Sequence, residues 1–392
     1  MAQNFRRDSL TWLTYALISF YGYFLNVLGP ITPFLQDELK LSYTVASLHF
    51  TAFGVGILLM GLGGHRVIQR LGAWRALWTG ALGLSGGVFA LVAGRTPWVT
   101  IAASFVMGLI GSLILVLVPA LLADHHGDQR AVALTEANTL SSFIAAIAAL
   151  LAGWSAQTAA GWRLSLIVVA LTPAVLRLGF GRAQAHLAPP PAAPGPAAQP
   201  TRNLPLRFWV YWVALVLGVS VEFCMISWSA GYLEKGMGLP RASAAQAVSL
   251  FLGGMIVGRL AGSRLVQRLS AARLATQSVI LAAAGFLVFW LAANPLLAEA
   301  GLFLTGLGVA NLYPTILSLA IGAAAGKTVE AGARATLASG SAILALPLVL
   351  GRLADAAGIR LAYGIVLFLL AGTLLIIQLS TWRRAPQAAA GA

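Results

Sequence analysis

The sequence has few charged residues and a single cysteine, and each shortage excludes a class of protein. Charged residues make up only 9% of the 392 residues, while hydrophobic residues make up 59%. A soluble domain carries roughly 25% charged residues, so we expect a membrane protein instead. Cys224 is the only cysteine, which excludes an internal disulfide or a cysteine-based metal site.

The sequence also lacks the motifs of ATP-driven and catalytic proteins. No Gly-x-x-x-x-Gly-Lys stretch is present, which excludes ATP-driven transport by this chain alone. No nucleophile–base set or zinc spacing occurs, so we expect no enzyme, metal or cofactor. His125 and His126 lie near Asp124 and Asp128, a loop pattern more typical of solvated side chains. Arg6 and Arg7 precede an apolar run too long for a signal peptide.

Long apolar runs fill most of the chain. A span needs about 20 apolar residues, and only helices or closed barrels satisfy the backbone in lipid. The runs predict spans at 10–34, 43–63, 74–94, 98–122, 132–155, 162–182, 207–233, 243–265, 272–293, 297–322, 331–352 and 359–381. The expected fold is therefore an all-α membrane protein with twelve transmembrane helices.

The basic residues that give a net charge of +14 fall mainly between the apolar runs. Such loop charges set topology, so the lipid bilayer and not nucleic acid is the expected partner. Seven of the 25 basic residues fall on one side, namely Lys40, Arg95, Arg163, Lys235, Arg241, Arg352 and Arg360. The excess on the other side predicts that both termini are cytoplasmic. Alanine-rich, arginine-over-lysine usage indicates a bacterial inner membrane.

A segment rich in proline and alanine divides the runs into two sets of six. Such a composition is typical of an extended linker. We therefore predict an N-terminal bundle at 1–184, a cytoplasmic linker at 185–206 and a C-terminal bundle at 207–392.

The two halves share a repeated stretch. Residues 64–75, GHRVIQRLGAWR, match residues 262–273, GSRLVQRLSAAR, at seven of twelve positions. Both copies follow the second span of their half. Parallel six-span repeats are the layout of transporters whose halves rock around a central site, so we expect two pseudo-symmetric bundles and alternating access.

These stretches resemble the loop signature of the major facilitator superfamily, with Gln69 and Gln267 in place of its acid. The stretches GLGVANLYPT (306–315) and GRLADAAG (351–358) also fit that family. The resemblance implies a membrane transporter with a gate on the cytoplasmic side. Candidate gate residues are Arg70, Arg75, Glu136, Arg268, Arg273 and Arg334. Glu136 or Glu330 would supply the missing acid, and Glu136 with Arg334 is a candidate pair.

Within that family the second half resembles the fucose-permease-like sugar porters. The shared frame consists of Glu222, Trp228, Tyr232-Leu233, Ser249-Leu250-Phe251 and Gly258-Arg259. Spans one and four contain no acid, so proton symport of a hexose is not implied. The Gly-Pro pair of drug antiporters is absent from residues 143–153, which argues against proton-driven drug efflux.

Glu222 lies near the middle of a span, where a charge costs about 3 kcal/mol unless it faces a polar site. Polar stripes at helical spacing occur in other spans. Candidate substrate-binding residues are Tyr15, Asn26, Asn138, Glu222, Trp228 and Asn311. Each has an alternative that remains open. Glu222 could be a purely structural buried acid, and Trp228 could lie at the membrane surface. Asn26 could bond to backbone beside close packing at Gly22 and Gly29, and Asn311 to the backbone that Pro314 frees where it kinks the helix.

Three functions are compatible with these residues. The leading hypothesis is a monomeric secondary active or facilitative transporter of a small polar organic solute, sugar-like by resemblance. Glu222 would contact the solute or carry a coupling proton. An exporter of amphipathic, drug-like compounds is the alternative, and a membrane sensor that does not transport is a third.

Overall fold

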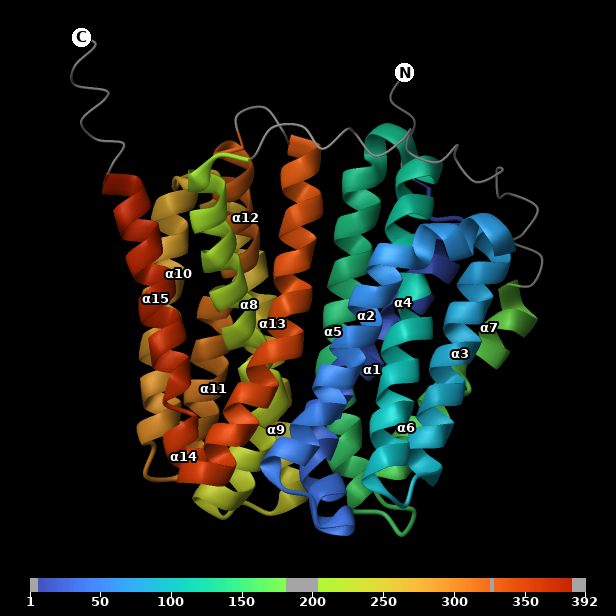
Figure 1. Cartoon of the computed structure of the whole chain (residues 1–392), viewed down its shortest axis with the longest axis horizontal. Coiled ribbons are helices and arrows are strands. Elements are labelled where there is room, and N and C mark those ends of the chain that lie inside the picture. The colour runs from blue at the N-terminus through green and yellow to red at the C-terminus, as the bar shows by residue number, and fades with distance from the viewer. Residues whose placement is uncertain (1–5, 181–203, 325–327, 383–392) are drawn as a thin grey trace.

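The computed structural model describes residues 6–180, 204–324 and 328–382, which form a bundle of long helices (Figure 1). Every regular element in these ranges is a helix, as predicted. The first half contains α1 (Ser9–Leu39), α2 (Tyr43–Leu71), α3 (Ala73–Ala93), α4 (Pro97–His126), η1 (Gly127–Gln129), α5 (Arg130–Ala156), α6 (Arg163–Ala170) and α7 (Thr172–Phe180). The second contains α8 (Leu206–Gly231), η3 (Tyr232–Gly236), α9 (Arg241–Leu265), α10 (Ala271–Leu291), α11 (Pro295–Val309), α12 (Leu312–Gly322), α13 (Thr328–Ala357), α14 (Ile359–Ala362) and α15 (Ile365–Trp382).

Eleven helical segments of the described chain are long and apolar enough to cross a membrane, and they coincide with eleven of the predicted spans. The predicted first span is α1, which has 31 residues but does not meet the same hydropathy criterion. Tyrosines, glycines and Asn26 lower its mean hydropathy. Most of α1 is buried against α4, α5 and α8, so it needs less apolar surface than a helix facing lipid.

Two predicted spans are each interrupted beside a proline. Span six is split at Leu171 into α6 and α7, and span ten is split at Ala310 and Asn311 into α11 and α12. Proline cannot donate the hydrogen bond that the fourth residue before it would accept. Pro173 and Pro314 therefore leave carbonyl groups at 169 and 310 without their helical partners. The kink expected in span ten is a break between two helices.

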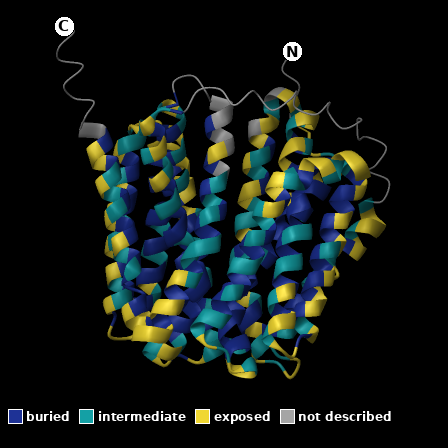
Figure 2. Cartoon of the chain, viewed as in Figure 1, coloured by how far each residue is buried: buried dark blue, intermediate teal, exposed yellow. Residues whose placement is uncertain are grey.

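Each half has its own hydrophobic cluster. One cluster is built from α1–α7 and the other mainly from α8–α15. Buried residues fill the interior of both halves, whereas exposed residues lie on the outside (Figure 2). Residues 185–203 of the predicted linker lie outside the described residues, so its conformation stays a prediction.

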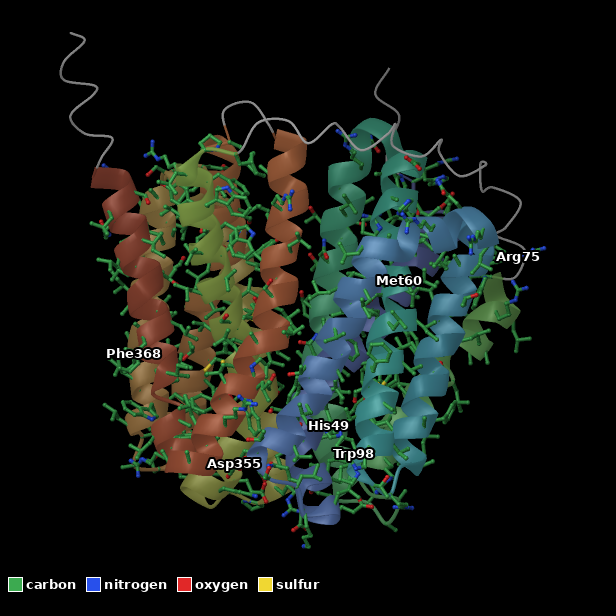
Figure 3. All side chains as sticks on the ribbon, in the orientation of Figure 1. His49, Met60, Arg75, Trp98, Asp355 and Phe368 are labelled. Carbon is green, nitrogen blue, oxygen red and sulfur yellow. The ribbon has the colours of Figure 1, made fainter. Side chains whose placement is uncertain are left out.

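The two ends of the bundle differ in how the halves meet. We name the end that carries Asp355 and Trp98 the closed end, and the end that carries Arg75 the open end (Figure 3). At the closed end Asp355 of α13 accepts hydrogen bonds of 2.8 Å from the backbone N–H groups of Tyr43 and Thr44 of α2. Arg241 of α9 bonds Asp37 of α1 at 3.0 Å. Both contacts join the first half to the second.

The repeated arginines lie at the opposite end. Three of them, Arg66, Arg70 and Arg75, lie around the connection between α2 and α3. Their counterparts Arg264, Arg268 and Arg273 lie around the connection between α9 and α10. All six side chains are exposed, and none forms an ion pair with a described acid. The sequence repeat therefore occupies equivalent places in the two halves.

Candidate functional site

Glu222 lies on α8, a helix that packs against helices of both halves, including α1, α9 and α13. Its side chain is 21% exposed, and its Oε1 lies 4.0 Å from a terminal nitrogen of Arg259 on α9. Two opposite charges thus face each other inside the helices, with Glu222 near the middle of its span and Arg259 six residues before the end of its own. The pairing offsets part of the cost of placing each charge there.

Arg259 connects this pair to the first half of the molecule. One of its terminal nitrogens donates to Oγ of Ser142 on α5 at 2.7 Å. Ser142 in turn donates to the carbonyl of Asn138 at 2.9 Å. A chain of contacts therefore runs from α8 through α9 to α5, across the boundary between the halves. Asn138 belongs to it through its backbone, since its side-chain amide donates to Leu134 of its own helix.

Asn311 positions the helix that carries Arg259. It lies at the break between α11 and α12 and donates to the carbonyl of Gly258 at 2.9 Å. A Cβ at Gly262 would overlap the Asn311 side chain, so α9 approaches the break closely. Asn311 therefore hydrogen-bonds to backbone, as in the alternative given for it. The backbone group is not the one freed by Pro314, however, but the carbonyl of Gly258 on α9, next to Arg259.

Asn26 lies among close helix contacts on α1. Its amide donates to the carbonyl of Gly22 in the previous turn at 2.8 Å. Cβ atoms at Gly22 and Gly29 would overlap Ser141 of α5 and Ile226 of α8. In this conformation Asn26 therefore bonds to backbone beside close packing at Gly22 and Gly29, which is the packing alternative given for this residue.

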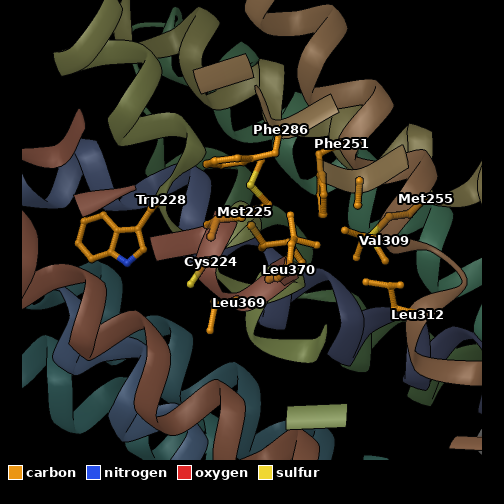
Figure 4. Packing of buried hydrophobic residues seen from close by; sticks show 14 of the residues in the cluster. Cys224, Met225, Trp228, Phe251, Met255, Phe286, Val309, Leu312, Leu369 and Leu370 are labelled. Carbon is orange, nitrogen blue, oxygen red and sulfur yellow. The ribbon is translucent and has the colours of Figure 1, made fainter. Parts of the chain in front are cut away.

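Trp228 is fully buried toward the closed end, where it packs against α2. Its indole donates to the carbonyl of Pro347 at 3.3 Å, and its ring lies 5.6 Å from Tyr43 and 6.2 Å from Phe50 of α2. Figure 4 shows it at the edge of the second-half cluster. In this conformation Trp228 packs between the two halves and does not lie at the membrane surface.

Among the described residues, no candidate gate residue forms an ion pair across the halves. Glu136 accepts two hydrogen bonds from Arg7, at 2.6 and 2.8 Å, and one from Tyr15 at 3.2 Å. All three lie in the first half. Arg334 is exposed and forms no ion pair with a described acid, and the side chain of Glu330 lies outside the described residues. A Glu136–Arg334 pair remains a prediction for another conformation.

Asp8 stabilises the start of α1 just outside the membrane-spanning part. It accepts from the backbone N–H of Thr11 at 2.9 Å and contacts Nε2 of His125 at 2.7 Å. Burial raises the pKa of Asp8, but the hydrogen bonds from Thr11 and the nearby His125 outweigh it and hold the pKa below its ordinary value. This stabilisation is complete above that ordinary value and is lost as the pH falls through the lowered one.

Several residues that join the halves had no role predicted from the sequence. Arg259 was noted only as part of the Gly258-Arg259 frame, Arg241 only as a loop charge and Asp355 only within the stretch 351–358, while Asp37 was not singled out at all. For Arg259, the one signal in the sequence was a basic residue inside a predicted span, six residues before its end. Within the described chain no three His, Cys, Asp or Glu side chains are grouped so as to hold a metal ion.

Long helices in two packed halves, joined where Arg259 of the Glu222–Arg259 pair contacts Ser142, define a multi-pass membrane protein of the transporter class. A family model of the Major Facilitator Superfamily matches residues 12–346. The chain belongs to this superfamily.

Curated relatives and solved structures agree with this assignment. An uncharacterized MFS-type transporter of Yersinia pestis is 28% identical over 170 residues, which are 42% of this chain and 43% of that one. An uncharacterized transporter of Sinorhizobium fredii is 34% identical over 162 residues, 41% of this chain and 42% of its own. The matches thus span about two fifths of these relatives.

Three solved structures illustrate the shared fold. A peptide transporter POT in complex with sulfate has a TM-score of 0.78 at 14% identity, covering 97% of this chain and 96% of its own. A bacterial homolog to the human lysosomal transporter Spinster, inward-facing, has a TM-score of 0.75 at 13% identity, covering 96% and 98%. FucP in the outward conformation has a TM-score of 0.61 at 18% identity, covering 95% and 99%.

Proposed function

We propose that this chain is a secondary transporter that carries a small polar organic solute by alternating access, with Glu222 and Arg259 at its solute site. The observation that carries this proposal is the contact chain Glu222–Arg259–Ser142, which crosses between the halves. Both charged side chains are partly exposed, at 21% and 45%. A solute that entered between them would change the contact that joins the halves, as alternating access requires.

The direction of the opening follows from the proposed topology. Exposed arginines gather at the open end, and the positive-inside rule then places that end in the cytoplasm. We propose a bacterial inner membrane with both termini cytoplasmic. In this orientation the structure is closed toward the outside by Asp355, Arg241 and Trp228.

Glu222 is the proposed coupling acid. It is the one carboxylate of the described spans placed near mid-membrane beside a basic side chain. A proton on Glu222 would remove its attraction to Arg259 and loosen the contact chain. If transport is instead independent of a proton gradient, the protein is a facilitator.

Transport assays in proteoliposomes test the proposal. The solutes are D-glucose, D-gluconate and the lipophilic cation tetraphenylphosphonium, each tested by counterflow and by uptake driven by a proton gradient. We expect counterflow of a small polar solute, and loss of gradient-driven uptake in Glu222→Gln. Glu299→Gln makes the same chemical change at the closed-end start of α11 and should keep wild-type rates.

Three results would contradict the proposal or a part of it. Counterflow of tetraphenylphosphonium alone would support the exporter of amphipathic compounds, while binding without any counterflow would support a sensor. Unchanged gradient-driven uptake and pH dependence in Glu222→Gln would exclude the coupling role of that residue.

A further inference from the structure

The Glu222–Arg259 pair is the loosest ion pair among the described residues. Its atoms lie 4.0 Å apart, whereas the Arg7–Glu136, Arg163–Glu38 and Arg241–Glu234 pairs lie within 2.6–2.7 Å. A separation of 4.0 Å is too long for a hydrogen bond. The two groups therefore attract each other without using each other's hydrogen-bonding capacity.

Both groups retain donors or acceptors that no described residue uses. Arg259 presents five N–H donors in a planar fork, and Ser142 accepts from one terminal nitrogen. The Glu222 carboxylate accepts no hydrogen bond from the described chain. The pair therefore keeps hydrogen-bonding capacity that a ligand can use.

The pair is also accessible to a third molecule. The Arg259 side chain is 45% exposed and the Glu222 side chain 21% exposed, although both lie within helices that span the bundle. The tight pairs at the closed end, Arg163–Glu38 and Arg241–Glu234, in contrast join the ends of neighbouring helices. Asn311 and the close approach at Gly262 fix the backbone of α9 beside Arg259, and Ser142 holds one end of its guanidinium.

We propose that this site, as the solute site of the proposed transporter, binds a small carboxylate that bears a hydroxyl or ammonium group beside it. The carboxylate docks on the Arg259 fork, because guanidinium and carboxylate match as two parallel hydrogen bonds. The adjacent donor group hydrogen-bonds to Glu222. This inference rests on the transport function proposed above and narrows its solute from sugars in general to sugar acids, hydroxy acids or amino acids.

The chemistry explains why both functional groups are needed. A neutral polyol offers the guanidinium only single hydroxyl acceptors, so it leaves the bidentate capacity of Arg259 unused. A carboxylate without a neighbouring donor leaves Glu222 facing a second anion at close range, which is unfavourable at low dielectric. A molecule that carries both groups satisfies both side chains at once.

Binding of four compounds with a three-carbon skeleton tests this complementarity. Lactate carries a carboxylate and a hydroxyl, alanine a carboxylate and an ammonium, propionate a carboxylate alone, and propane-1,2-diol no carboxylate. D-gluconate and D-glucose make the same comparison at hexose size. Calorimetry on the purified full-length protein should show that gluconate binds at least about tenfold more tightly than glucose. Lactate or alanine should exceed both propionate and the diol.

Two substitutions assign the groups. Arg259→Lys keeps the charge but loses the fork, so it should weaken carboxylate binding about tenfold and remove the preference for gluconate over glucose. Glu222→Gln should abolish the preference for lactate or alanine over propionate. Arg360→Lys, on the exposed closed-end surface, is the control and should bind as the wild type does. Melting temperatures establish that each variant is folded.

The possible outcomes separate this inference from the function it rests on. If glucose or the diol binds as tightly as the carboxylates and is exchanged by counterflow, the inference is wrong and the transport function stands. If carboxylates bind through Arg259 but no compound is exchanged, the transport function is wrong and the binding site stands. If wild type and Arg259→Lys bind carboxylates equally, Arg259 is not the anchor.

Discussion

At Gly29 the backbones of two helices approach more closely than any side chain would allow. A Cβ on this residue would overlap the carbonyl of Ile226 on α8. Because α1 belongs to one half and α8 to the other, this glycine sets how tightly the halves meet. The contact is backbone against backbone, and neither partner has a flexible side-chain end that can move aside.

We expect Gly29→Ala to destabilise this conformation. Overpacking of a tight contact typically costs about 1–3 kcal/mol, which should lower the melting temperature in detergent by several degrees. Gly86→Ala on α3 is the matched control, since a Cβ there meets nothing within 4 Å. An unchanged melting temperature in Gly29→Ala would show that α1 and α8 separate at no cost.

Residues differ in how far the sequence predicts their surroundings. The position of Glu222 within a span followed from hydropathy, which is a local property. Its partner Arg259 lies 37 residues further along, and their pairing depends on how α8 and α9 rotate against each other. Tyr15 and Asn26 fall on the predicted stripe, but their partners Glu136 and Gly22 depend on which groups compete for each hydrogen bond.

At the scale of whole elements, Asp355 caps a helix of the opposite half. The first N–H groups of a helix lack intrahelical partners, and a carboxylate there is stabilised by the helix dipole as well. Asp355 supplies this cap to α2 from the last turn of α13. Opening the closed end would break both hydrogen bonds.

We expect Asp355→Asn to favour the state in which the closed end is open. Losing the charge and one acceptor costs about 1–2 kcal/mol, which corresponds to about a five- to thirtyfold shift in population. Ser47→Cys reports this opening, because Ser47 is buried against Gly351 and the native Cys224 is buried. Its reaction with a water-soluble maleimide should accelerate by that factor.

The control for this experiment is Asp124→Asn, which makes the same change on an exposed side chain at the end of α4. It should leave the maleimide rate at Ser47→Cys unchanged. Equal rates with and without Asp355→Asn would show that the cap does not contribute to closure.

The elements themselves were largely predictable, because each span is a continuous apolar run. The splits in spans six and ten were only partly predictable. Pro314 indicated a kink, but the sequence did not show that the helix restarts at Leu312 with Asn311 bonded to α9. Prolines inside α1, at positions 30 and 33, cause no such break, so the outcome depends on what packs against the freed carbonyl.

At the scale of the whole molecule, the two ends carry basic residues in different settings. At the closed end Arg95 and Arg163 share Glu38, and Arg241 binds both Asp37 and Glu234. At the open end the six repeated arginines are exposed without acidic partners among the described residues. Uncompensated positive charge is therefore concentrated at one end.

This asymmetry predicts the orientation in the membrane. Green fluorescent protein fused after the last residue should fluoresce, and alkaline phosphatase fused there should be inactive, because the C-terminus is cytoplasmic. Alkaline phosphatase inserted after Lys40, at the closed end, should be active and serves as the control. Active phosphatase at the C-terminus would reverse the assignment of the two ends.

The contact at Gly29 also divides α1 into two arms of unequal length. From Gly29 the helix extends 20 residues back to Ser9 and 10 residues on to Leu39, which correspond to arms of about 30 and 15 Å at 1.5 Å per residue. A rotation of about 10° around this fulcrum moves the long arm by about 5 Å, one helical pitch, and the short arm by half as much. The tightly bonded closed end therefore needs only a small displacement to produce a large one at the open end.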